Sequence, residues 1–322
     1  MTVGRWVRRG GIVLLGVLIL VATVAVGLYV VGAREPASQI ASGSGPVWFV
    51  ALRLAAAEDQ SAPGAGAQGA RKDIAVPWEE LLRPGVALHW LSRAEFAVIG
   101  PAESYWHAFA VVQGTRESSE PLDSRRFPGV VDDAQILALT LERPPRLVLG
   151  ALKVLALSGL ASVPRMTETA ESLAQRALGG VGMPTGKQMA QVLNAPESLE
   201  PAMVNWLAYR SKADYPPGAK APAAAGGSLS GAAAYRRYGL VALQTAYRSG
   251  GQLIFVGDVN AVVRAPETGP TQGSWNSIAV MRYPRPSAML GMEQVPAYRA
   301  ALIDRAAGLE RTVVIASDPE RR

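Results

Sequence analysis

Few side chains in this chain of 322 residues could carry out acid–base or nucleophilic chemistry. It contains no cysteine, which excludes disulfides, thiolate nucleophiles and zinc–thiolate sites. Its two histidines, His89 and His107, lie outside the spacings of zinc-binding motifs, so we predict no metal site. His107 follows Trp106 on an expected strand and is one candidate acid or base, with Tyr209 as the other. A structural role for His107 is the simpler hypothesis.

Two glycine-rich segments match nucleotide-binding motifs only in part. Residues Gly64 to Gly69 satisfy G-x-G-x-x-G, but they lie inside a Pro/Ala/Gly loop instead of at the end of a strand. In the segment Gly182 to Lys187 the first glycine comes one position late, and Gln188 stands where a phosphate loop requires Ser or Thr. We therefore predict that the protein uses no cofactor.

A second group of polar and aromatic residues falls on expected strands and helices of the second half. If these residues face the space between helix and sheet, they form an apolar pocket with a few polar groups, suited to a small aromatic or acidic organic ligand. Strand alternation places Asn205 and Tyr209 on one face and Arg210 on the other, so not all of them can line one cavity. For each, a structural role is the alternative. The candidate ligand-binding residues are Asn205, Tyr209, Arg210, Tyr235, Tyr238, Trp275, Tyr283 and Arg305.

These residues lie in the second half of a predicted internal repeat. At an offset of 157 positions, Arg53 matches Arg210 and Gly100 matches Gly257, with three Trp, Tyr and Ser pairs between them. Each half is expected to run strand, helix, strand, strand, helix, strand. The expected strands are 46–54, 96–100, 105–113, 136–141, 202–210, 252–257, 275–283 and 312–316, and the expected helices are 77–91, 127–135, 232–248 and 296–309.

Several segments of the second half together resemble a known family. In order, they are AMVNWLAYR (202–210), AAYRRYG (233–239), GGQLIFVGDV (250–259), WNSIAVMRYP (275–284) and PAYRAALIDRAAGL (296–309). This part resembles the uncharacterised family called domain of unknown function 1330, in the dimeric α+β barrel superfamily. The resemblance implies a ferredoxin-like unit that closes a barrel with a second copy, and it implies no reaction.

We therefore predict an α+β fold in which two ferredoxin-like (βαββαβ) halves pack sheet to sheet as an intramolecular dimeric α+β barrel. The first half, residues 46–145, is a diverged copy. A helical connector, residues 146–193, leads to the second half, residues 194–319.

A membrane anchor is predicted before the first half. Residues 10–33 carry no charge and are long enough for a helix that crosses the roughly 30 Å hydrocarbon layer, with 34–45 as a linker. Because Arg5, Arg8 and Arg9 precede this segment, residues 1–9 are expected in the cytoplasm. This gives a single-pass protein of the bacterial inner membrane, with most of the chain periplasmic or extracellular. A cleaved signal peptide is the alternative.

The connector contains a second apolar segment, residues 147–163, which carries Lys153 near its centre. A buried connector is the main interpretation, with a membrane-surface helix and a second crossing as alternatives. After residue 35 the net charge is 28 minus 25, or +3, and it is scattered, so nucleic acid is not an expected partner. The oligomeric state stays open.

Three functions are compatible with these features. Because no reactive constellation is present, the leading hypothesis is a small-molecule-binding or interaction module. The second is a cofactor-independent, monooxygenase- or isomerase-like enzyme that acts on a small organic substrate in the barrel. The third is a structural ectodomain that self-associates through its strand edges.

Overall fold

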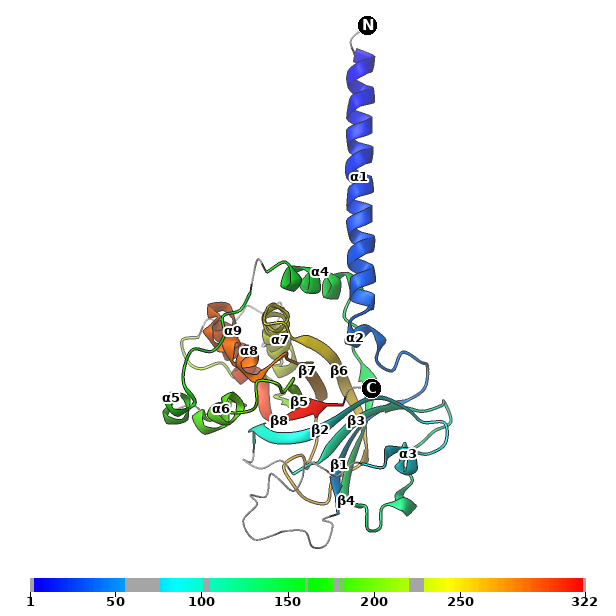
Figure 1. Cartoon of the computed structure of the whole chain (residues 1–322), viewed down its shortest axis with the longest axis vertical. Coiled ribbons are helices and arrows are strands. Elements are labelled where there is room, and N and C mark those ends of the chain that lie inside the picture. The colour runs from blue at the N-terminus through cyan, green and yellow to red at the C-terminus, as the bar shows by residue number, and fades with distance from the viewer. Residues whose placement is uncertain are drawn as a thin grey trace.

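The fold is a single closed barrel of eight antiparallel strands in the order β1-β3-β2-β8-β5-β7-β6-β4 (Figure 1). The computed structural model describes residues 3–55, 76–100, 105–159, 162–176, 180, 182–219 and 229–320, with side chains from residue 17 onward except that of residue 18. The glycine-rich motif at 64–69 lies outside the described residues. The strands are β1 (Val47–Leu54), β2 (Ala87–Ile99), β3 (Ala108–Gln113), β4 (Val131–Leu141), β5 (Ala202–Tyr209), β6 (Gln252–Arg264), β7 (Ser277–Arg282) and β8 (Leu309–Pro319).

Two long strands close the barrel. β2 pairs with β3 through Ala87–Arg93 and then with β8 through Ser92–Ile99. β6 pairs in the same way with β7 and then with β4. Every strand therefore has two hydrogen-bonded neighbours, although the two halves of β2 and of β6 each pair on one side only.

The predicted pair of ferredoxin-like sheets packed face to face is wrong. One sheet closes on itself instead, and its interior is the main core. Numbered within each half, the strands run in the same order, β4-β1-β3-β2 and β8-β5-β7-β6. The helices do not repeat, because the described residues of the first half form only the four-residue helix α3 (Trp78–Leu81) and a 3-10 turn at Ser124–Arg126. The helix expected at 77–91 is reduced to α3, with β2 beginning at Ala87, and in place of the one expected at 127–135 β4 begins at Val131.

The second half carries the long helices, which pack on one side of the barrel (Figure 1). Ser230 caps the start of α7, where its hydroxyl accepts a hydrogen bond from the Ala233 amide. Two glycines let α7 and α9 meet: a Cβ on Gly231 or on Gly308 would overlap backbone atoms of the other segment. The helices of this side are α5 (Ala170–Gln175), α6 (Gly186–Leu193), α7 (Gly231–Arg248), α8 (Pro286–Leu290) and α9 (Pro296–Gly308).

The N-terminal helix α1 (Val3–Ala33) projects from the molecule, and α4 (Arg146–Leu157) lies across its C-terminal end (Figure 1). In the part of the chain that the structure describes, no helix combines the length and the apolar character needed to cross a bilayer. The predicted anchor at 10–33 and the single-pass inner-membrane location are corrected on this finding.

Candidate ligand-binding site

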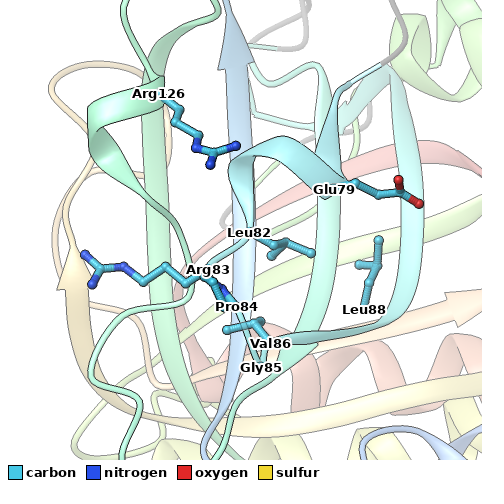
Figure 2. A pocket seen from close by; sticks show the side chains of 8 residues that line it. All are labelled: Glu79, Leu82, Arg83, Pro84, Gly85, Val86, Leu88 and Arg126. Atoms are coloured by element: carbon cyan, nitrogen blue, oxygen red, sulfur yellow. The ribbon is translucent and has the colours of Figure 1, made fainter.

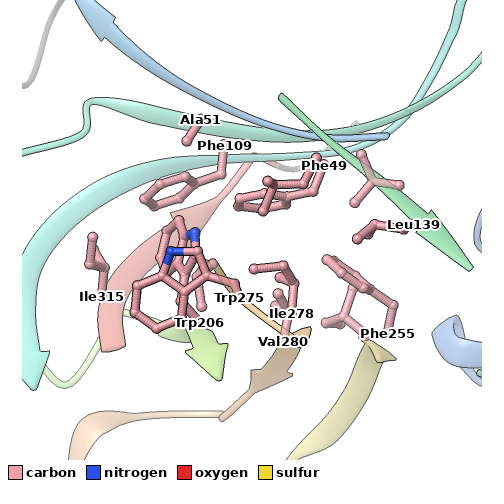
Figure 3. Packing of buried hydrophobic residues seen from close by; sticks show 14 of the residues in the cluster. Phe49, Ala51, Phe109, Leu139, Trp206, Phe255, Trp275, Ile278, Val280 and Ile315 are labelled. Carbon is pink, nitrogen blue, oxygen red and sulfur yellow. The ribbon is translucent and has the colours of Figure 1, made fainter. Parts of the chain in front are cut away.

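Aromatic side chains fill the interior of the barrel (Figure 3). The ring of Phe49 lies 5.4 Å from that of Trp206 and 6.0 Å from that of Phe109, centroid to centroid. Phe255 packs 6.4 Å from Phe49 on the opposite wall. All four side chains are fully buried or nearly so. Because these rings occupy the centre of the barrel, a ligand site is expected outside it.

One end of the barrel is closed by the connection between β6 and β7. Its residue Thr271 is fully buried, and its carbonyl oxygen accepts hydrogen bonds from Trp275 Nε1 (2.7 Å) and Gln135 Nε2 (2.9 Å). The Thr271 hydroxyl accepts a hydrogen bond from Trp106 Nε1 (3.1 Å), and Gln135 Oε1 accepts one from Trp206 Nε1 (2.9 Å). Trp275, a predicted ligand-binding residue, therefore belongs to the barrel core.

The other end is covered by residues that follow the short helix α2 (Pro36–Gln39). Ile40 and Ala41 are buried against the barrel core. The guanidinium of Arg143 donates hydrogen bonds to the carbonyl oxygens of Ile40 and Ala41, each at 2.7 Å. The charged guanidinium of Arg143 thus satisfies these backbone carbonyl oxygens and holds Ile40 and Ala41 against the end of the barrel.

Four tyrosines form a continuous row between the barrel and the helices on its outer side. Tyr209 ends β5, Tyr235 and Tyr238 lie one turn apart on α7, and Tyr298 lies in the first turn of α9. Successive ring centroids are 5.3, 5.4 and 5.9 Å apart. The hydroxyl groups of Tyr238 and Tyr298 are hydrogen-bonded at 3.1 Å. We call these four residues the tyrosine row.

Arg305 of α9 lies at the tyrosine row. Its side chain is buried, with 6% of the residue exposed, and its guanidinium carbon lies 5.7 Å from the centre of the Tyr238 ring. Nη1 donates to the thioether sulfur of Met183 at 3.2 Å. Within the described residues, no carboxylate lies within 4 Å of the Arg305 guanidinium.

Burial controls the ionisation of this site. It raises the pKa of Tyr209 to about 12 and raises the pKa of Tyr235, Tyr283 and Tyr298 further. These phenols are therefore neutral hydrogen-bonding groups at neutral pH. Burial also raises the pKa of Glu293, although the positive charges of Arg176, Arg305 and Arg299 act in the opposite direction.

The structure brings together five of the eight predicted ligand-binding residues. These are Tyr209, Tyr235, Tyr238, Tyr283 and Arg305. Tyr283 is included because it is buried against the same helices and because Tyr238 contributes to the rise of its pKa. Asn205 also faces the helices, but its amide donates to the carbonyl oxygens of Met203 (2.8 Å) and Ala279 (3.0 Å). Its donors are therefore used within the sheet.

Two other candidates are placed by hydrogen bonds with backbone groups of other segments. Arg210 directly follows Tyr209, and its backbone is bonded to Gly308 and Gly231 between the two helices. His107 Nδ1 accepts a hydrogen bond from the Leu54 amide at 3.0 Å. This bond ties the histidine to the end of β1, an arrangement that a structural role would also produce.

Tyr298 and Met183 were not among the residues predicted from the sequence. Tyr298 stands seven positions before Arg305, a spacing that places both on one face of a helix, so the PAYRAALIDR segment contained a usable signal. Met183 comes from a segment before α6 that is distant in sequence, and no local pattern marks it.

A surface pocket lies next to α3, on the side of the barrel opposite the tyrosine row (Figure 2). It is an open surface pocket of about 430 Å³. Its two guanidinium groups already have anionic partners, since Arg83 lies 3.0 Å from Glu120 and Arg126 lies 3.7 Å from Asp123. This pocket therefore offers no unpaired guanidinium group to an anionic ligand. Nowhere among the described residues do His, Asp or Glu side chains gather in a group that could hold a metal ion.

Comparisons with known proteins add little to this geometry. Neither a protein-family model nor a curated protein matches the chain. Two crystal structures of the protein RPA0582 do match, one of the methylated protein and one described as a protein of unknown function from Rhodopseudomonas palustris. Each is 26% identical over 45% of this chain and 98% or 100% of the other, with a TM-score of 0.37. At that score we draw no conclusion from the likeness, and the resemblance to domain of unknown function 1330 stays a prediction.

Proposed function

We propose that the protein is a small-molecule-binding module whose site is the tyrosine row together with Tyr283 and Arg305. The observation that carries the proposal is the row itself, in which each of four phenol rings contacts the next. The buried guanidinium of Arg305 lies over the ring of Tyr238. Aromatic faces and a few fixed polar groups are typical of sites for small planar organic molecules.

The filled barrel interior supports a site on the outer side, against the helices. Binding there needs movement only of side chains between the barrel and α7 or α9, whereas a ligand inside the barrel would have to displace Phe49 and Trp206.

Binding is a better account of this geometry than catalysis. Of the two candidate acids or bases, His107 is bonded to the backbone of β1. Tyr209 has a pKa raised to about 12 by burial, so it would be a poor base at neutral pH. Self-association through strand edges is also disfavoured, because each strand of the closed barrel already pairs with two neighbours and only parts of β2 and β6 have a free side.

Thermal unfolding of the full chain in the presence of small aromatic compounds tests the proposal. We expect at least one of phenol, indole, benzamide and benzoate to raise the melting temperature in a concentration-dependent way. Replacing Tyr298 by Phe removes one hydroxyl of the row and should weaken that binding about 3- to 10-fold, the effect of one lost hydrogen bond.

Tyr29→Phe is the matched control, because Tyr29 lies on α1, away from the row. The proposal fails if none of the four probes stabilises the protein. It also fails if a stabilising probe binds the Tyr298→Phe and Tyr238→Phe variants as tightly as it binds the wild type.

A further inference from the structure

Arg305 carries a positive charge in a place where charge is costly. The residue is 94% buried, since 6% of it is exposed, and the described residues around it supply no carboxylate at ion-pair distance. Burying an ionised group without a counter-charge is unfavourable, and buried guanidinium groups are normally paired with anions. The position therefore has an unmet requirement for a negative charge.

The hydrogen-bond partner that Arg305 does have is a weak one. Its Nη1 donates to the Met183 sulfur at 3.2 Å, and a thioether is a poor acceptor compared with a carboxylate. A guanidinium has five N–H donors in a planar fork that matches the two oxygens of a carboxylate. Met183 thus occupies a place that an oxyanion would fill better.

The backbone next to Met183 packs closely against α9 and β8. Gly182 has a φ of +75°, and a Cβ at this position would lie 3.2 Å from Leu309 Cδ1, 3.3 Å from the Thr312 methyl carbon and 3.7 Å from Arg305 Nη1. Since Gly182 has no side chain, its backbone fits here, and Met183 is the neighbour whose side chain contacts the guanidinium. Three arginines, Arg176, Arg299 and Arg305, act on the carboxyl of Glu293 in this region, and Arg176 is itself paired with Glu168 at 3.2 Å.

From these observations we infer that Arg305 is an oxyanion subsite that binds the carboxylate of a small aromatic acid, with Met183 displaced from the guanidinium on binding. The tyrosine row would hold the aromatic ring of the same molecule. The inference rests on the proposed function for its ring subsite, and it adds the charge and the functional group of the ligand. Benzoate is the simplest probe of this class, and benzamide is its neutral counterpart of nearly the same shape.

The first experiment compares these two probes by thermal unfolding and calorimetric titration of the full chain at constant ionic strength. We expect benzoate to bind at least about tenfold more tightly than benzamide, the difference made by hydrogen bonds to a charged group. In Arg305→Gln that preference should disappear while weak binding of benzamide remains. Arg236→Gln, an exposed arginine on α7, is the control and should keep the preference.

A second variant tests the subsite without any added ligand. Met183→Glu places a carboxylate next to Arg305, where it should pair with the guanidinium. We expect this variant to melt at least about 2 °C above the wild type and to lose the benzoate preference. Met183→Gln has the same shape without the charge, so it should gain no comparable stability and should still prefer benzoate.

The two proposals fail in different ways. If benzamide and benzoate bind equally well, or if Met183→Glu is no more stable than Met183→Gln, the oxyanion subsite is wrong even though the tyrosine row binds ligands. If no aromatic probe binds but Met183→Glu is stabilised relative to Met183→Gln, the anion requirement of Arg305 holds and the ring subsite is wrong. Should Arg305→Gln fail to fold, the two Met183 variants still decide the question.

Discussion

Gly32 and Gly150 face each other where α1 crosses α4, and the two helix backbones touch there. A Cβ on Gly32 would overlap the carbonyl oxygen of Arg146, and one on Gly150 would overlap that of Leu28. Next to this crossing, the buried carboxylate of Glu35 accepts a hydrogen bond from the Tyr247 hydroxyl at 2.8 Å. The absence of two side chains is therefore what allows α1 to join the rest of the molecule at this angle.

Gly32→Ala is expected to loosen that junction. A methyl group at this point forces the helices apart, and overpacking of this kind costs about 1–3 kcal/mol. Hydrogen exchange of the α4 amides should become faster, because α4 loses its support. Gly27→Ala, on the same helix, meets nothing within 4 Å and should leave the exchange of α4 unchanged. Equal rates of hydrogen exchange of the α4 amides in the two variants would contradict the close contact between α1 and α4.

Gly231→Ala should destabilise the junction of α7 and α9. The added methyl group would lie against backbone atoms of Arg210 and Gly308, which cannot move aside as the end of a flexible side chain could. We expect a loss of about 1–3 kcal/mol in urea unfolding. Gly239→Ala on the same helix meets nothing within 4 Å, so it should be stabilising by up to about 1 kcal/mol through helix propensity. The free energy of unfolding should therefore fall in Gly231→Ala and rise in Gly239→Ala, and a change of the same sign in both variants would contradict the close packing at Gly231.

Thr271→Val tests the closure of the barrel end. The substitution keeps the shape of the side chain but removes the hydroxyl that accepts the hydrogen bond from Trp106. Loss of this buried hydrogen bond should cost about 0.5–1.5 kcal/mol, which denaturant unfolding followed by tryptophan fluorescence can measure. Thr115→Val changes an exposed hydroxyl and should cost less than about 0.5 kcal/mol. A neutral result for Thr271→Val would mean that this bond does not help to hold the connection.

The protein should lose stability at alkaline pH because of its buried tyrosines. The pKa of Tyr209 in the folded state is about 12, above the value of about 10 expected when it is unfolded. The stability from keeping this phenol neutral is fully present below about pH 10 and is lost as the pH rises toward 12. Tyr209→Phe removes this group, so the free energy of unfolding should fall less steeply over that interval.

Absorbance at 295 nm, recorded in the same titration, provides the check. Buried phenols should ionise only above the pH at which free tyrosine does. If the phenolate signal is complete near pH 10 in the folded protein, the buried state of the row is contradicted.

Much of the secondary structure could be predicted from local sequence. The run Val47–Leu54 is apolar on both faces, and it forms β1, which is buried on both faces. The spacing of apolar residues over 296–309 predicts a helix, and α9 confirms it. Such patterns depend on neighbours within one or two turns, so the sequence contains them directly. The prediction fails at 77–91, where Pro84 and Gly85 interrupt the pattern, the helix ends at Leu81 and β2 begins at Ala87.

The closure of the barrel was decided only by tertiary structure. Whether two similar sets of strands stack as separate sheets or join edge to edge depends on pairing between residues far apart in the chain, such as Ser92 with Pro319. The same apolar alternation suits both arrangements, because it buries one strand face in either case.

The sequence by itself determined which chemical groups this protein can use: neutral phenols, guanidinium groups and no thiol. Tertiary structure decided which of them meet. It placed Trp275 in the barrel core, tied His107 to the backbone, and brought Met183 to Arg305 across more than one hundred positions of sequence. The physical reason is that ring contacts and buried charges form between segments that only the folded chain brings together.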